Sequence, residues 1–237
     1  MKIDVLFQDC QNDFFPPDGA LAIQDASSIR SNLERILKFA FSNGFRVLLF
    51  EDMHIDGDPE FKDFPPHCVK GTGGSELIEE IAINLKETPM CMSYEFRGDE
   101  ETFSNLPLKA GVLPSSDHEN VPRVFEKHVI DIFLEQSFAS YIDARHPDAV
   151  LLCGVATDYC IKAAALGLRE KGIKVYLFLD AIAGVFGEST IAALEMMRKA
   201  GVQFITTGHM MQLSYLDAEF GSRFDHHAGR RSWIPLQ

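Results

Sequence analysis

Three reactive side chains, Asp9, Lys127 and Cys160, each follow a short apolar segment of the kind that forms buried strands. A thiol becomes a nucleophile when it loses its proton, and a neighbouring carboxylate can accept that proton and return it to a leaving group. An ammonium beside them holds the carboxylate and favours a thiolate electrostatically. These residue types predict covalent catalysis by Cys160 with Asp9 as the general base, provided that the fold brings them together.

Cys160 lies in the first turn of a predicted helix that follows a strand after a short connection. Backbone N–H groups and the helix dipole at such a position favour a thiolate over a free thiol, whose reference pKa is about 8.5. An isolated cysteine is more often a buried structural residue, and we expect that role for Cys153. Asp9 and Lys127 also have ordinary alternatives, as a turn-capping acid and a solvated lysine.

A second group of polar side chains, Asp52, His54, Glu60 and His67, offers nitrogen and oxygen ligands. Imidazole and carboxylate ligands suit zinc, iron or manganese. The alternative is a polar loop with incidental histidines. Because Asp52 and His54 follow another apolar segment, they should lie at the same edge of the fold as the thiol. That location favours one divalent metal ion, with zinc as the first choice.

The elements that must position these residues alternate between short apolar segments and segments with helical periodicity. Near-continuous apolar strands indicate a parallel sheet that is covered on both faces, so we predict a three-layer α-β-α fold with about six strands. Ligands of such sheets bind outside the carboxyl ends of the strands. The predicted strands are Ile3–Gln8, Arg46–Phe50, Arg123–Glu126, Ala149–Cys153, Lys174–Leu179 and Val202–Thr206, and the predicted helices are Ser27–Ser42, Glu76–Leu85, Asp158–Glu170 and Ser189–Lys199.

Length and composition predict a single domain over residues 1–237, since the chain is 46% hydrophobic and can bury one substantial core. Residues 88–122 are long, mixed and proline-containing, and we interpret them as an inserted loop or lid over the pocket mouth, or as a contact between subunits. Residues 210–237 form a polar and aromatic C-terminal tail.

Charge and cysteine content exclude several classes of function. The formal net charge of −13 argues against a nucleic-acid or anionic-membrane surface. The five cysteines are odd in number and include no C-x-x-C pair, which argues against a disulfide framework. We find neither a signal-peptide pattern nor an apolar run of the ~20 residues that a membrane helix needs. We therefore expect a cytoplasmic protein.

Five parts of the sequence carry a resemblance to a known family, and the match covers most of residues 3–206. They are Phe7–Phe14, Asp52–His54, Phe64–Thr72, Lys127 and Gly154–Cys160. With these motifs the chain resembles the nicotinamidase/pyrazinamidase branch of the isochorismatase-like cysteine hydrolases. The Gly154–Cys160 block is typical of the superfamily, and the Phe64–Thr72 block together with Asp52–His54 indicates the nicotinamidase branch.

The resemblance implies a catalytic triad of Asp9, Lys127 and Cys160 that hydrolyses nicotinamide to nicotinate and ammonia through a thioester. It implies a cis peptide between Val155 and Ala156, and an oxyanion hole formed by the backbone N–H groups of Ala156 and Cys160. It further implies a divalent metal on Asp52, His54 and His67 that binds the pyridine nitrogen, a homo-oligomer, and a role in NAD salvage.

Two positions depart from the pattern of many relatives. Glu60 stands where a third histidine is common, so we expect it as a fourth ligand, direct or through water. Phe64 replaces a tryptophan, and we expect its ring, with that of Phe14, to pack against a flat substrate. Two alternatives remain: a related hydrolase acting on another small amide, a carbamoyl compound or an isochorismate-like ether, and a non-enzymatic binding domain. The complete triad argues against the second.

Overall fold

The computed structural model describes residues 2–15, 17–87 and 121–210. Its centre is a sheet of six parallel strands in the order β3-β2-β1-β4-β5-β6, which confirms the predicted fold class. The strands are β1 (Ile3–Gln8), β2 (Arg46–Asp52), β3 (Arg123–Lys127), β4 (Ala149–Val155), β5 (Lys174–Ala183) and β6 (Gln203–Ile205).

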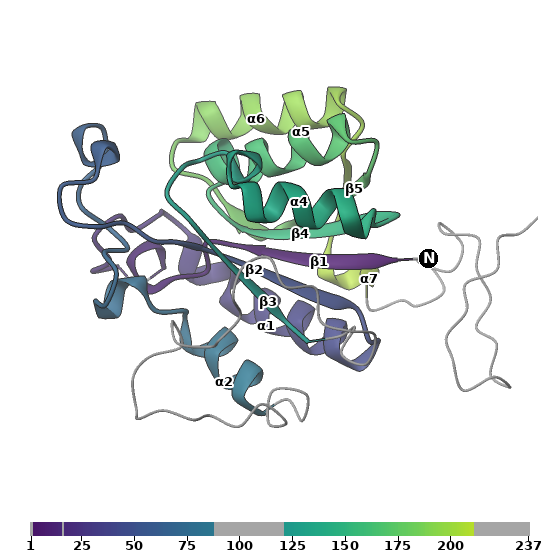
Figure 1. Ribbon diagram of the computed structural model, residues 1–237, viewed down its shortest axis with the longest axis horizontal. Helices are drawn as coiled ribbons and strands as arrows, with labels where there is room; N and C mark the ends of the chain where they lie inside the picture. Colours follow the sequence, from purple (N-terminus) through teal and green to yellow (C-terminus); the bar gives the residue numbers. More distant parts are fainter. Residues whose placement is uncertain (1, 16, 88–120, 211–237) are drawn as a thin grey trace, which may run out of the picture.

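Helices cover both faces of this sheet, so the molecule has the three layers that the apolar strands require (Figure 1). One face packs against α1 and α2, and the opposite face packs against α4, α5 and α6. In α1, the buried positions follow the helical period through Ile29, Leu33 and Ile36. The helices are α1 (Ala26–Ser42), α2 (Glu79–Glu87), α4 (Gln136–Arg145), α5 (Lys162–Glu170), α6 (Gly187–Lys199) and α7 (Thr207–Met210).

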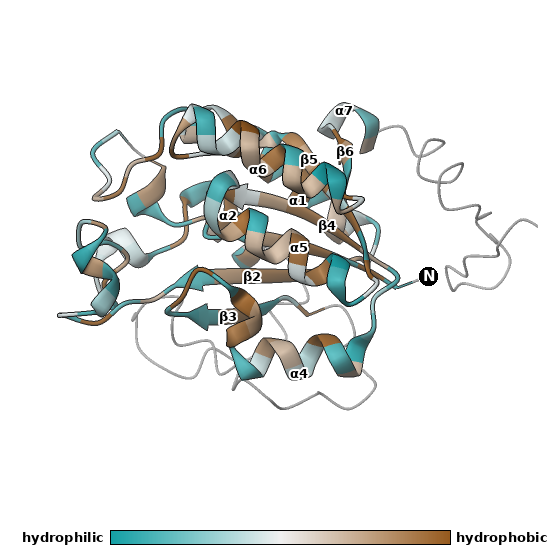
Figure 2. Ribbon diagram, turned by 90° about the horizontal axis from the view of Figure 1, so that it is seen from above, coloured by the Kyte–Doolittle hydropathy of each residue, from teal (hydrophilic) through white to brown (hydrophobic). Residues whose placement is uncertain are grey.

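Hydropathy follows the same layering. Every residue of β1, β2 and β4 is buried, whereas α5 and α6 carry hydrophilic residues beside their apolar ones (Figure 2). Among the helices of the described residues, none combines the length and apolar character that a membrane span requires. Residues 88–122 and 210–237 lie outside the described part of the chain, apart from residues 121, 122 and 210. Their predicted roles stay predictions.

The helical predictions differ most from the structure in three places, beside small shifts at other helix ends and the short, unpredicted α7. The predicted helix Asp158–Glu170 begins as a π-helical turn, Thr157–Ile161, and becomes α-helical only at Lys162. The helix predicted from Glu76 begins at Glu79, because Leu77 instead forms a bridge with Gln11. Helix α4 was not predicted. It is short, and it buries Phe138, Tyr141 and Ile142 at the i, i+3, i+4 spacing that amphipathic helices use.

Gly154 allows β4 to pass close to β1 just before Asp9. It has a φ of +113°, and a Cβ at this position would lie 2.0 Å from the carbonyl oxygen of Gln8, its partner residue in the sheet. Backbone atoms cannot move aside as a flexible side chain can. Only glycine therefore fits here.

We predict that Gly154→Ala lowers the free energy of unfolding by about 3 kcal/mol or more, or prevents soluble expression, because it combines backbone strain with a backbone clash. Gly187→Ala is the matched control, since a Cβ there meets nothing within 4 Å. It should change stability by less than about 1 kcal/mol in urea denaturation. Equal stability of the two variants would contradict this account of the strand pairing.

Candidate active site

Three adjacent strands bring the predicted polar residues together at their carboxyl ends. Asp52 and Lys127 are the last residues of β2 and β3, and they are partners in the sheet register. Asp9 follows β1 with a positive φ of 51°, and its N–H donates to the carbonyl of Phe50 at 3.1 Å. This bend turns the Asp9 carboxylate toward the end of β3. The strand order thus creates the polar cluster that the sequence predicted at this edge.

A buried ammonium lies between two carboxylates in this cluster. Lys127 Nζ is 2.8 Å from Asp52 Oδ1 and 3.1 Å from Asp9 Oδ2, and Lys127 is only 1% exposed. Burial disfavours its charge, but the Asp52 and Asp9 carboxylates outweigh burial and hold the pKa of Lys127 well above its usual value. Burial likewise acts to raise the pKa of Asp52, yet Lys127 and two histidines bring it well below the usual value. Lys127 and Asp52 are both charged at neutral pH.

Asp9 and Cys160 form the part of the cluster that can exchange a proton. Both side chains are buried in the wall of one pocket, and they interact electrostatically with each other. Burial, together with the charge of Asp52 and against that of Lys127, raises the pKa of Asp9 to about 6. Burial also raises the pKa of Cys160 well above its usual value, and the negative charge of Asp9 adds to this effect although Lys127 opposes it.

The sequence-based expectation of a stabilised thiolate is therefore wrong for the resting site. Lys127 does favour the thiolate, as expected, but the cost of burying another anion beside two carboxylates is larger. The resting pair at neutral pH is a Cys160 thiol and an Asp9 carboxylate. Proton transfer from sulfur to oxygen has to accompany the reaction.

The Cys160 turn follows directly from β4. The peptide bond between Val155 and Ala156 is cis, and Ala156 precedes the π-helical turn that contains Cys160. Cys160 is 9% exposed and Ala156 is 8% exposed, and both line the same pocket. N–H groups at the start of a helix lack intrahelical partners, so this turn is a suitable place for donors that face a developing anion.

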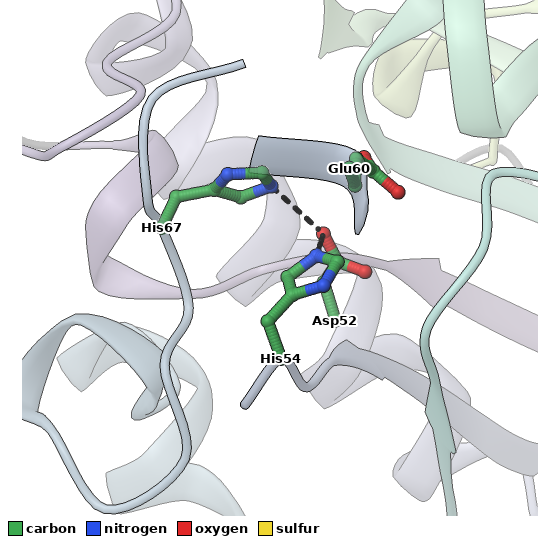
Figure 3. Close-up of side chains that lie close together, drawn as sticks. All are labelled: Asp52, His54, Glu60 and His67. Atoms are coloured by element: carbon green, nitrogen blue, oxygen red, sulfur yellow. Dashed lines mark hydrogen bonds and ion pairs between the residues drawn. The ribbon is translucent and has the colours of Figure 1, made fainter. Parts of the chain in front are cut away.

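Asp52 connects the ion pair to the predicted metal ligands. Its Oδ2 lies 3.1 Å from Nε2 of His54 and 3.2 Å from Nε2 of His67. Figure 3 shows the two imidazole rings converging on this oxygen, with Glu60 on the far side. One ligand atom from each of these four residues lies within 4.8 Å of the others. The structure thus gathers all four predicted ligands into one group.

The donor set fits a metal ion. The carbonyl of Pro65 is 2.8 Å from Nδ1 of His67, which assigns the hydrogen to Nδ1 and leaves the unprotonated Nε2 facing Asp52 and the rest of the cluster. His54 is fully buried, and its Nε2 has no hydrogen-bond partner although Asp52 is close. Burial opposes protonation of His54, but Asp52 and Asp58 outweigh it and raise its pKa to about 9. Such excess negative charge around imidazole nitrogens favours a cation.

A pocket of about 370 Å³, its open mouth included, joins the thiol and the metal-ligand group. Asp9 and Cys160 lie in its wall together with Asp52, Glu60 and His67. Phe14 and Phe64 line it as predicted, and both rings contact His67 edge-on, with centroid distances of 5.5 and 6.3 Å. Tyr159, which the sequence analysis did not single out, packs edge-on against Phe64 at 5.6 Å. Flat apolar side chains and two polar groups therefore share the wall of one pocket.

Comparison with known proteins decides the family. The isochorismatase domain family matches residues 5–96 and 96–209, which together make up most of the chain. The chain belongs to the isochorismatase family. Among curated members of this family, the nicotinamidase/pyrazinamidase of Mycobacterium tuberculosis is 26% identical over 208 residues, covering 85% of this chain and 97% of the relative.

Solved structures of other isochorismatase-family proteins have the same fold. The pyrazinamidase/nicotinamidase of Streptococcus mutans matches with a TM-score of 0.68 at 22% identity, covering 86% of this chain and all of that chain. The pyrazinamidase of Pyrococcus horikoshii, solved in complex with zinc, matches with a TM-score of 0.65 at 23% identity, covering 87% and 99%. Together with the curated relatives, these findings support the nicotinamidase branch of the isochorismatase family and indicate an amidohydrolase.

The roles of two residues of this isochorismatase-family site were not predicted from the sequence, and neither residue lines the pocket. Asp58 Oδ2 lies 3.0 Å from Nδ1 of His54, so it orients the ring from behind, as carboxylates often do for metal-ligating histidines. The Gln11 side chain accepts from the N–H of Asp52 at 2.7 Å and donates to its carbonyl at 2.8 Å. Gln11 thereby fixes the backbone of Asp52 where β2 ends. Gln11 lies within the Phe7–Phe14 motif, whereas the only sequence signal for Asp58 was its position between the predicted ligands His54 and Glu60.

We predict that iodoacetamide alkylates Cys160 faster than Cys10, Cys68 or Cys153, because Cys160 lines the pocket whereas the other three are at most 1% exposed. Peptide mass spectrometry at short labelling times measures the order. Cys160→Ser serves as the control and should remove the fastest label among these four cysteines. Faster alkylation of any of the other three would contradict the geometry of this pocket.

Proposed function

We propose that this chain hydrolyses nicotinamide to nicotinate and ammonia through a thioester on Cys160. The observation that carries the proposal is the lining of the pocket, which combines a thiol and its acid–base partner, a metal-ligand group and flat aromatic side chains. A planar ring with a carboxamide on one side and a ring nitrogen on the other matches this lining. The similarity to nicotinamidases over nearly their whole length supports the same substrate.

The residues of the site divide the chemistry between them. Cys160 Sγ attacks the carboxamide carbon while Asp9 takes the thiol proton, so that no free thiolate has to persist in the buried site. The backbone N–H groups of Ala156 and Cys160 donate to the oxyanion of the tetrahedral intermediate. Asp9 then gives its proton to the leaving nitrogen, and ammonia departs as the C–N bond breaks and the thioester remains.

The second half of the reaction returns the site to its starting state. Asp9, again a carboxylate, removes a proton from water as the water oxygen attacks the thioester carbon. The C–S bond breaks, the thiolate leaving group takes up the proton from Asp9, and nicotinic acid leaves and loses its carboxyl proton to solvent to become nicotinate. Lys127 stays protonated throughout and holds the Asp9 carboxylate in place. Its role is electrostatic and positional.

Asp52, His54 and His67, with Glu60 as a fourth ligand, would hold one divalent metal. Zinc is our choice, on the mixed nitrogen and oxygen donor set and on the zinc complex of the Pyrococcus horikoshii relative. When bound, the metal supplies a Lewis-acid position for the ring nitrogen of the substrate. Asp58 and the Pro65 carbonyl keep the two imidazole rings in orientation.

We predict that His54→Ala abolishes stoichiometric metal, whereas Glu60→Ala weakens metal binding without abolishing it, because Glu60 is half-buried and at the edge of the group. Elemental analysis of purified protein and zinc titration measure this. His209→Ala, at an exposed histidine in α7, is the matched control and should retain the metal. A fully active, metal-free wild-type preparation would refute the site.

We predict that kcat/KM for nicotinamide falls as the pH decreases through about 6, because Asp9 acts as a base only when deprotonated and its pKa is raised to about 6. The rate should be level above that pH until another group titrates. Asp9→Asn and Lys127→Ala should each lower kcat/KM for nicotinamide on the order of a hundredfold or more. An acidic limb near the ordinary value of ~3.9, or none at all, would remove Asp9 from this role.

We predict that benzamide, which has the ring and amide of nicotinamide but no ring nitrogen, reacts at least roughly tenfold more slowly, because the metal-ligand group of the pocket is left unpaired. Pyrazinamide, which keeps a ring nitrogen, should remain a substrate. Ammonia release measures all three. Equal rates on benzamide and nicotinamide would show that the metal-ligand group does not hold the substrate, and activity only on another amide would favour a different hydrolase of the superfamily.

A further inference from the structure

Asp158 is a buried carboxylate two residues before Cys160 that the proposed reaction does not use. It is 2% exposed and belongs to the same π-helical turn, Thr157–Ile161. Residues of this turn are fixed to β4 on one side and α5 on the other. A carboxylate buried there needs hydrogen-bond donors. The residues that donate show which part of the chain Asp158 connects to the turn.

The donors in the described residues all come from one short segment 27 to 31 residues further along the chain. Asp158 Oδ1 accepts from the N–H of Val185 at 2.9 Å, and Oδ2 accepts from the N–H of Phe186 at 3.2 Å and from the hydroxyl of Ser189. Phe186 is the N-cap residue of α6 and makes no side-chain cap of its own. Asp158 therefore binds the backbone just before α6 and one hydroxyl in its first turn, where a negative charge also favours the helix dipole.

The segment that Asp158 binds forms part of the pocket. Val185 lines the pocket together with Ala156 and Cys160. Sheet pairing holds the chain only as far as Ala183, which pairs with Val155. Beyond Ala183, the Asp158 carboxylate makes the hydrogen bonds that connect the Val185 wall to the turn that carries the thiol.

We propose that Asp158 is a positioning residue that sets the distance between the Val185 wall and the Cys160 thiol, and thereby determines how a flat acyl group is presented to the sulfur. The proposal rests on the proposed function only for the identity of that acyl group. Asp158→Asn keeps one acceptor oxygen but turns an NH2 group toward an N–H or O–H donor. The wall should then move relative to the thiol while Asp9, Lys127 and Cys160 remain in place.

The test compares two reagents that alkylate Cys160. Iodoacetamide is small and reports the intrinsic reactivity of the thiol, whereas its N-phenyl analogue carries a ring that the pocket walls must accept. The measured quantity is the alkylation rate constant of the N-phenyl analogue divided by that of iodoacetamide. In Asp158→Asn this ratio should fall roughly tenfold or more, since misplacements of about 1 Å change reaction rates by at least this factor. The rate with iodoacetamide itself should stay near the wild-type value. An unchanged ratio would overturn the proposal.

Asp180 provides the matched control. Its carboxylate also bridges distant segments, accepting from the N–H of Thr207 at 2.9 and 3.0 Å and from the Thr207 hydroxyl at 2.6 Å, but it does not line the pocket. Asp180→Asn should lower the melting temperature without changing the ratio. An equal fall of the ratio in Asp180→Asn would mean that Asp158 contributes only general stability.

Two further variants keep the proposal testable if Asp158→Asn does not fold. Val185→Ala shortens the wall itself and should lower the ratio roughly tenfold, because small apolar groups in a pocket typically change discrimination between ligands by about this factor. Ser189→Ala removes one of the three donors and should lower it less. An unchanged ratio in both variants would overturn the proposal. Because neither reagent is an amide substrate, these outcomes hold even if nicotinamide is not hydrolysed, and that failure would be recognised separately by ammonia release.

Discussion

The ion pair network around Lys127 is the interaction on which the rest of this site depends. A fully buried ammonium lies between two carboxylates, Asp9 at 3.1 Å and Asp52 at 2.8 Å. Burying such charges is costly, and removing one of them leaves the others uncompensated, which typically costs about 3–5 kcal/mol. The network persists because three adjacent parallel strands end at the same level. The sheet order and the pairing of Asp52 with Lys127 thus create the site directly.

The network also divides the site into two halves with different tasks. Asp52 uses Oδ1 for Lys127 and Oδ2 for the two imidazole rings, so one carboxylate joins the acid–base half to the metal-ligand half. The same charges separate the proton affinities: the pKa of Lys127 is far above its usual value, that of Asp52 is well below, and that of Asp9 is about 6. Within the network, Asp9 is the group whose pKa lies closest to neutral pH.

The sequence predicted the sheet and the residues that gather at its edge, because both follow from patterns along the chain. Continuous apolar strands indicated a covered parallel sheet, and polar residues after strand ends had to meet at one edge. The π-helical turn at Cys160 could not be predicted, since no pattern in Thr157–Ile161 distinguishes a π-helical turn from the first turn of an α-helix. The protonation state of Cys160 was also mispredicted, because the desolvation of a thiol depends on which residues surround it in the folded protein. Asp58 and Asp158 act through contacts that no local pattern reveals.

The central claim is that Cys160, served by Asp9 and Lys127, forms a covalent acyl intermediate with the substrate. The most direct test is to quench the enzyme with acid during turnover of nicotinamide, digest it, and search by mass spectrometry for an added nicotinoyl group. The account predicts this group on the peptide that contains Cys160, sensitive to hydroxylamine as a thioester is. Ammonia released at the wild-type rate by a Cys160→Ala variant, with no acylated cysteine in either protein, would contradict it.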